Sequence, residues 1–109
     1  MKRVNMSLIL GLIASVYAST AMAEDIGSAK DGFIFAQTVC AKCHAVRDGE
    51  RASPNAQAPS FTTVANTSGM NAMALEVWFQ TPHPTMPNLI LSNQESDNVI
   101  AYILSLRKH

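Results

Sequence analysis

Both cysteines of this 109-residue chain lie within one short C-x-x-C-H segment that runs from Cys40 to His44. Two cysteines three positions apart can project from the same side of a helical turn. Their sulfurs could then form thioethers with the two vinyl groups of one porphyrin, and the adjacent histidine could give its iron a nitrogen ligand. The spacing is therefore typical of a covalent haem c attachment site formed by Cys40, Cys43 and His44.

Three other kinds of site share part of this pattern. A structural zinc site needs four ligands, and His83 and His109 do not have a finger-like spacing to the two cysteines. A thioredoxin-like redox pair normally accompanies a βαβ pattern, which this sequence lacks. A thiol redox pair or a structural disulfide, without haem, remains the alternative to haem attachment.

The N-terminus has the pattern of a secretory signal peptide. Two basic residues, Lys2 and Arg3, precede an apolar run, and a stretch of small residues then ends at Ala23. A retained membrane anchor is the alternative, but about 20 apolar residues are needed to span a bilayer and this run is shorter. We therefore expect residues 1–23 to be a cleaved signal peptide and residues 24–109 to be one domain, exported to the periplasm.

The remaining segment, residues 24–109, is long enough for one small domain. A chain of this size buries only about 60% of its unfolded surface, so a bound cofactor commonly completes its core. Without the two basic residues of the signal peptide, six basic residues face eight acidic ones, a formal charge of 6 − 8 = −2. The charges are interspersed, which leaves no basic patch for nucleic acid and no polybasic segment for a membrane. We expect a soluble monomer without nucleic-acid partners or stable membrane insertion.

The first half of this domain contains one clear helix and a loop. Ser28 is a suitable N-cap for a helix over residues 29–39, which leads directly into the C-x-x-C-H segment. Residues 45–59 show little periodicity and are rich in polar, Gly and Pro residues, as expected of a surface loop. Ser60 could cap a short helical turn after this loop.

Two further helices follow in the second half. Asn71 could cap one of them, which must end before the proline-containing segment 81–88. Ser92 and Glu95 form an S-x-x-E capping box that opens the last helix, which we expect to reach about residue 107. No stretch alternates as a strand would. The sequence predicts an all-α fold of about three main helices plus short turns wrapped around one haem.

These features together match the small bacterial class I c-type cytochromes, which the chain resembles over essentially its whole mature length. Gly32 corresponds to the glycine at which the family's first and last helices cross, and residues 99–102, Val-Ile-Ala-Tyr, resemble the matching segment of the last helix. Ala58-Pro59 resembles the segment whose proline carbonyl accepts the N–H of the proximal histidine. Met86-Pro87 resembles the motif of the distal ligand. The resemblance implies the cytochrome c fold.

The resemblance also makes Met86 the sixth iron ligand. A thioether in this position saturates the iron and raises its potential relative to bis-histidine ligation. Alternatively, Met86 only packs against the core, or His83, three residues earlier, binds the iron in its place. Met70 and Met73 lie at or near a helix start and are more simply core or surface residues.

Large apolar residues have two compatible roles, core packing and lining of a haem crevice: Phe35, Phe61, Trp78, Phe79 and Leu89. Such surroundings lower the local dielectric and so disfavour the extra positive charge of ferric haem. Trp78 or Tyr102 could also donate a hydrogen bond to a haem propionate or to the ligand sulfur. Without such a bond, both are expected in the core.

With both axial positions filled, no open site remains for a substrate, oxygen or peroxide. We therefore expect electron transfer by haem c rather than enzymatic catalysis. The expected partners are a donor dehydrogenase or reductase and an acceptor oxidase or other cytochrome. Two alternatives remain: a five-coordinate haem enzyme or gas sensor, if Met86 does not bind, and a haem subunit of a periplasmic dehydrogenase.

Surface charge gives little information about these partners. Lys42, Arg47 and Arg51 could flank an exposed haem edge and orient a partner, but such residues commonly have no partner. The dense lysine ring of the mitochondrial relatives is absent, so the resemblance does not extend to that mode of docking to an oxidase.

Overall fold

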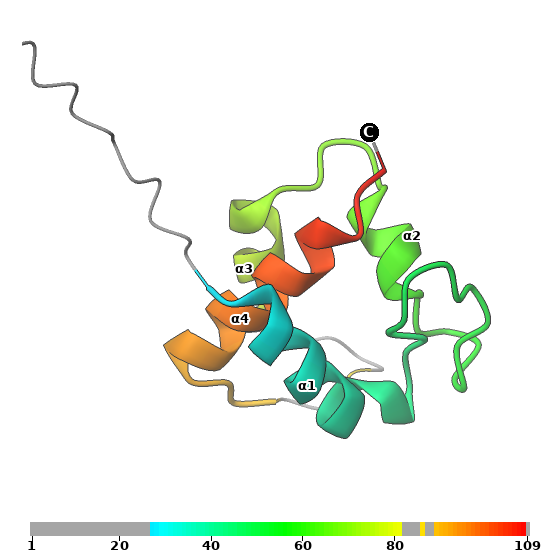
Figure 1. Ribbon diagram of the computed structural model, residues 1–109, viewed down its shortest axis with the longest axis horizontal. Helices are drawn as coiled ribbons and strands as arrows, with labels where there is room; N and C mark the ends of the chain where they lie inside the picture. Colours follow the sequence, from blue (N-terminus) through cyan, green and yellow to red (C-terminus); the bar gives the residue numbers. More distant parts are fainter. Residues whose placement is uncertain (1–26, 82–85, 87–88, 109) are drawn as a thin grey trace, which may run out of the picture.

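A computed structural model describes residues 27–81, 86 and 89–108 of the chain (Figure 1). These residues form helices and no strand, in the order α1 (Ala29–Val39), the 3₁₀ turn η1 (Cys40–Lys42), α2 (Phe61–Ala65), α3 (Ala72–Gln80) and α4 (Asn93–Ser105). The prediction of an all-α domain is confirmed for this part of the chain. Several features of the sequence lie outside the described residues: the expected signal peptide (1–23), Pro82, His83, Pro84 and Pro87.

Each of these α-helices begins at the polar residue that the sequence predicted as its N-cap. The side chains of Ser28, Ser60, Asn71 and Ser92 each accept a hydrogen bond from the backbone N–H three residues later. At α4 the Glu95 side chain also accepts from the N–H of Ser92, at 2.9 Å, which completes the capping box. The caps satisfy donors that the first turn of a helix otherwise leaves without a partner.

The C-terminal end of α4 differs from the prediction, because the helix ends at Ser105 rather than near residue 107. The N–H of Leu106 donates to the carbonyl of Ile103, a bond of the tighter i to i−3 type. The Arg107 guanidinium then donates to the carbonyl of Met70. The chain leaves the helix because its last residues bond to the segment before α3 instead of extending α4.

Helices α1 and α4 cross in close contact (Figure 1), and Gly32 lies at the crossing. A Cβ atom at this glycine would lie 1.9 Å from the carbonyl oxygen of Asn98 and 2.9 Å from the Cβ of Tyr102. The Asn98 side chain also accepts a hydrogen bond from the N–H of Ser28, at 2.9 Å. The backbones therefore approach so closely that only a residue without a side chain fits at position 32.

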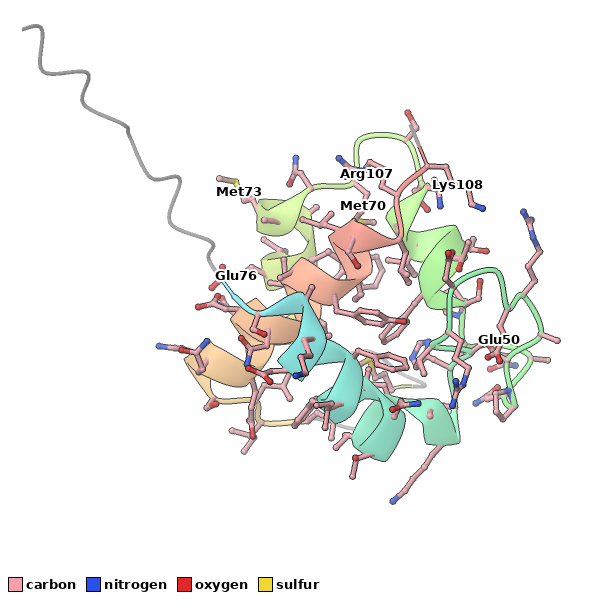
Figure 2. The ribbon with its side chains drawn as sticks, viewed as in Figure 1. Glu50, Met70, Met73, Glu76, Arg107 and Lys108 are labelled. Atoms are coloured by element: carbon pink, nitrogen blue, oxygen red, sulfur yellow. The ribbon has the colours of Figure 1, made fainter. Side chains whose placement is uncertain are left out.

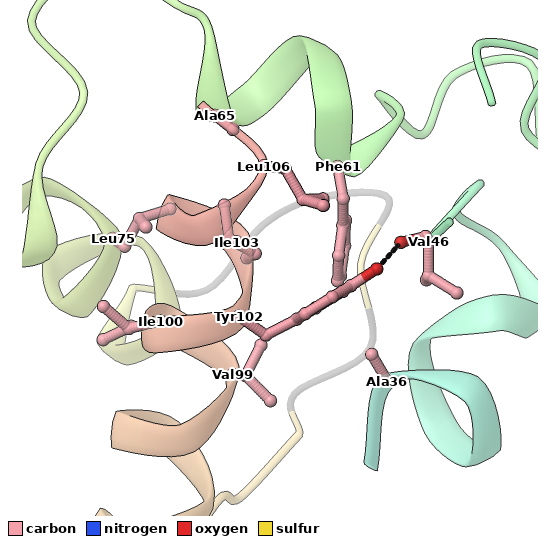
Figure 3. Packing of buried hydrophobic residues seen from close by; sticks show 10 residues of the cluster. All are labelled: Ala36, Val46, Phe61, Ala65, Leu75, Val99, Ile100, Tyr102, Ile103 and Leu106. Atoms are coloured by element: carbon pink, nitrogen blue, oxygen red, sulfur yellow. Dashed lines mark hydrogen bonds between the residues drawn. The ribbon is translucent and has the colours of Figure 1, made fainter. Parts of the chain in front are cut away.

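The core lies between this crossing and helices α2 and α3. Figure 3 shows its ten buried residues, which come from all four helices and from the segment after η1: Ala36, Val46, Phe61, Ala65, Leu75, Val99, Ile100, Tyr102, Ile103 and Leu106. Phe35 and Phe79 are half-buried and pack against this cluster. Val99 and Ile103, four residues apart on one face of α4, are both buried.

Trp78 is not part of this core, so the expectation that it packs there is wrong. Its side chain is 56% exposed, whereas Leu75 in the same helix is 3% exposed. Helix α3 contacts the core through Leu75 and Phe79, which are four residues apart and share one face. Trp78 lies at the edge of that face and remains accessible.

Candidate functional site

The two cysteines lie at the start and just past the end of the 3₁₀ turn that continues α1. The N–H groups of Cys43 and His44 both donate to the carbonyl of Cys40, at 3.1 and 2.9 Å. This tight turn brings Cys40, Cys43 and His44 close together within about one turn of the backbone. No disulfide joins the two cysteines, and both are half-buried.

The surroundings of Cys40 disfavour a charged sulfur. Burial raises the pKa of this thiol from its usual value of 9.0 to about 11. The cause is the loss of solvation that a thiolate would suffer. An uncharged form of the sulfur, either the thiol or a thioether, is therefore the form that suits this position.

The His44 ring is held from behind by a backbone carbonyl. Its Nδ1 lies 2.6 Å from the carbonyl oxygen of Pro59, so Nδ1 carries the proton and donates it to that oxygen. The ring also lies against Phe61, with 5.4 Å between the two ring centroids. The hydrogen bond to Pro59 fixes both the tautomer and the orientation of the imidazole, and it leaves Nε2 as the nitrogen able to bind a metal.

Four hydrogen bonds hold the backbone that follows the motif. They join Cys43 O to Asn55 N (3.1 Å), Ala45 N to Ser53 Oγ (3.0 Å), Ala45 O to Phe61 N (2.9 Å) and Val46 O to Tyr102 Oη (2.5 Å). The residues that supply them come from the loop, from α2 and from α4. His44 thus lies in a segment whose backbone is fixed on several sides.

Sequence reasoning did not assign Ser53 or Asn55 to this site. Both lie in the polar loop between the motif and α2, and loop composition alone does not show which residue bonds where. The one available signal is the Ser-Pro-Asn order at residues 53–55, which is typical of a turn that returns toward the preceding segment.

The remaining predicted site residues lie later in the sequence, in or after α3. Met86 is half-buried and lies at a bend. His83, the alternative ligand, lies outside the described part of the chain. Trp78 is exposed, Phe79 is half-buried and Leu89 is 36% exposed. Large apolar side chains on the described surface thus remain open to a bound group.

Among the residues that the structure describes, no group of three or more His, Cys, Asp and Glu side chains could hold a metal ion. The atoms that could bind a cofactor are two sulfurs and one imidazole nitrogen. These atoms belong to Cys40, Cys43 and His44 of the C-x-x-C-H turn. Figure 2 labels Met73 and Glu76, two exposed residues of α3.

Comparisons with known proteins identify the family of the chain. The model of the Cytochrome c family matches residues 29–107. Cytochrome c-552 of Bradyrhizobium diazoefficiens is 38% identical over 100 residues, which cover 92% of this chain and 90% of that protein. No solved structure matches the chain. The chain therefore belongs to the cytochrome c family and takes part in haem-based electron transfer through a covalently attached haem c.

Proposed function

We propose that the protein is a periplasmic carrier of single electrons, whose haem c is attached to Cys40 and Cys43 and whose iron is bound by His44 and Met86. The observation that carries this proposal is the 2.6 Å contact between Nδ1 of His44 and the carbonyl of Pro59. A histidine used as an axial ligand commonly donates its second ring N–H to such an acceptor.

The residues of the C-x-x-C-H turn fit a covalently bound haem. Addition of the Cys40 thiol across a haem vinyl group would transfer its hydrogen to carbon and leave an uncharged thioether sulfur, which suits the partly desolvated position of Cys40. The side chain of Trp78 is 56% exposed and offers apolar surface that a porphyrin could cover. Trp78 is proposed to line the cofactor, which would account for a large aromatic residue outside the core.

Met86 is proposed as the distal ligand because it is half-buried and because the Met86-Pro87 pair resembles the ligand motif of the family. Met73, the exposed alternative on α3, is 77% accessible and lies on an outward face. A thioether ligand holds both oxidation states of iron without a change in charge of its own.

When bound, haem c supplies an iron that gains and loses one electron. The chain's own part is to keep the ligand geometry the same in both states. Pro59 holds the proton on Nδ1 of His44, and the fixed backbone of residues 43–46 keeps the ring from turning. Little rearrangement would then accompany each transfer, and Phe61 gives the His44 ring an apolar neighbour.

The periplasmic location rests on the signal-peptide pattern of residues 1–23. Within the described residues, no helix is long and apolar enough to cross a membrane. The proposed partners are proteins that exchange single electrons, a dehydrogenase or reductase as donor and an oxidase or another cytochrome as acceptor. We further propose that the carrier acts as a monomer.

Replacement of the distal ligand tests the proposal. In the purified holoprotein, Met86→Ala should abolish the long-wavelength absorption band between sulfur and ferric iron and lower the midpoint potential strongly. Met73→Ala is the matched control and should change neither. If Met86→Ala leaves both properties intact, the carrier site is wrong as proposed, and the same changes in His83→Ala instead would make His83 the ligand.

A second measurement addresses attachment. The pyridine-haemochrome spectrum of the denatured protein should remain with the polypeptide, since thioether bonds survive unfolding. Its loss on denaturation would favour thiol chemistry at Cys40 and Cys43 instead.

A further inference from the structure

The carbonyl of Val46, two residues after His44, accepts its hydrogen bond from a residue far along the chain. The donor is the Tyr102 hydroxyl, on α4, at 2.5 Å (Figure 3). The other three bonds to residues 43–46 come from the loop and from the start of α2. Tyr102 is therefore the contact that ties the segment of His44 to the last helix.

The position of the Tyr102 hydroxyl is tightly determined. The side chain is only 7% exposed. Its ring lies 5.1 Å from the ring of Phe33 on α1 and 6.4 Å from that of Phe61 on α2, as measured between centroids. With its ring held on two sides, the hydroxyl presents its proton to the Val46 carbonyl at little further cost in side-chain entropy.

The Val46 carbonyl and the His44 ring are linked by a short path. Ala45, between them, accepts a hydrogen bond from the N–H of Phe61, and Pro59, two residues before Phe61, accepts the proton of the His44 ring. Two short segments, residues 44–46 and 59–61, thus lie side by side and are joined by these two bonds. A shift of Val46 would move one segment against the other and lengthen the contact at Pro59.

We propose that Tyr102 is a positioning residue for the iron ligand: its hydroxyl holds Val46 so that the His44 ring keeps its hydrogen bond to Pro59. The inference rests on the proposed role of His44 as proximal ligand. Donation from Nδ1 to a carbonyl makes the imidazole a stronger base, which favours ferric iron and lowers the potential. Loss of the Tyr102 hydroxyl should therefore weaken that bond and raise the midpoint potential.

The test is Tyr102→Phe in the holoprotein, which keeps the ring packing and removes only the hydroxyl. In the ferrous form, the Nδ1 proton of His44 is observed by NMR, and its exchange with solvent should become about tenfold faster, the factor that one net hydrogen bond represents. The midpoint potential should rise. Ser105→Ala is the matched control, because it removes a hydroxyl that donates to the carbonyl of Tyr102 on the same helix, and it should leave both measurements unchanged.

A second variant keeps the hydroxyl and changes its strength as a hydrogen-bond donor. The only other tyrosine, Tyr17, lies in the expected signal peptide, so growth with 3-fluorotyrosine would alter Tyr102 alone in the mature chain. The fluorinated phenol is a better donor, and at neutral pH it should slow exchange of the His44 proton and lower the potential.

The outcomes separate the two levels of inference. Tyr102→Phe could lower only the free energy of unfolding and match Ser105→Ala in the exchange rate of the His44 proton and in the midpoint potential. Tyr102 would then be a structural residue, and the inference would be wrong. The inference is also wrong if the fluorinated protein shifts in the same direction as Tyr102→Phe. Absence of a His and Met iron spectrum in the wild type would instead refute the proposed function itself.

Discussion

A methyl group added at the helix crossing should destabilise the protein despite better helix propensity. In Gly32→Ala the new Cβ would lie 1.9 Å from the carbonyl oxygen of Asn98, whereas contacts below 3.0 Å essentially do not occur, so α1 and α4 must separate by 3.0 − 1.9 = 1.1 Å. Alanine gains about 1 kcal/mol over glycine in a helix interior. Overpacking in a well-packed core costs about 1–3 kcal/mol, and this clash is with rigid backbone rather than with a movable side chain. With the upper end of this range, about 3 kcal/mol, less the gain of about 1 kcal/mol, we expect a net loss of about 2 kcal/mol in the free energy of unfolding.

Thermal or guanidinium unfolding of the ferric holoprotein measures this loss. A change of about 2 kcal/mol corresponds to a fall in Tm of roughly 8–16 °C in a domain of this size. Gly49→Ala is the matched control, because nothing lies within 4 Å of its added Cβ and its cost comes only from the positive φ of 78°. An unchanged or higher Tm for Gly32→Ala would refute the argument that close backbone approach requires glycine at this crossing.

The remaining predictions concern the last helix. Ser92→Ala removes the hydrogen bond from the N–H of Glu95 to Ser92 Oγ and should lower the free energy of unfolding by about 1 kcal/mol. Ser92→Gly should lower it by only a few tenths of a kcal/mol. Equal losses for the two variants in denaturant titrations would contradict a capping role. Burial, with Asp48 and Glu50, raises the pKa of Tyr102 against the opposing effect of Arg47. Since the neutral phenol is favoured in the fold, this stabilisation is present below pH 10 and is lost as the pH rises through the folded-state pKa. Unfolding titrations should show a decline above pH 10 that is smaller in Tyr102→Phe, and an identical decline in both proteins would contradict the assignment.

Helix starts could be predicted from the sequence because their determinants are local. Ser28, Ser60, Asn71 and Ser92 each bond to a backbone group three residues away, so the pattern and the contact lie in the same short stretch. The attachment segment is local for the same reason, since a C-x-x-C-H turn needs no distant residue to form. These parts of the prediction depended on few assumptions about the tertiary structure.

Burial at the helix edge and long-range bonds could not be predicted in this way. Trp78 has the spacing of a core residue, but which side of α3 faces the core depends on how α3 packs on α4. The Tyr102 bond spans 56 residues and its acceptor is a backbone carbonyl, which residues of every type possess. No side-chain pattern marks such an acceptor, so this contact becomes visible only when the helices are placed.

The orientation of His44 follows from how a small domain fixes a polar loop. Residues 47–59 contribute no buried side chain to the core, so hydrophobic packing does little to hold them. Their order comes instead from bonds such as those of Ser53 and Asn55 to the segment after the motif. The same bonds carry Pro59 to the His44 ring, because the loop must close onto residues 43–46 before α2 begins. The loop and the ligand therefore order each other, and a substitution that loosens the loop should be detected at the iron before it is detected in the helices.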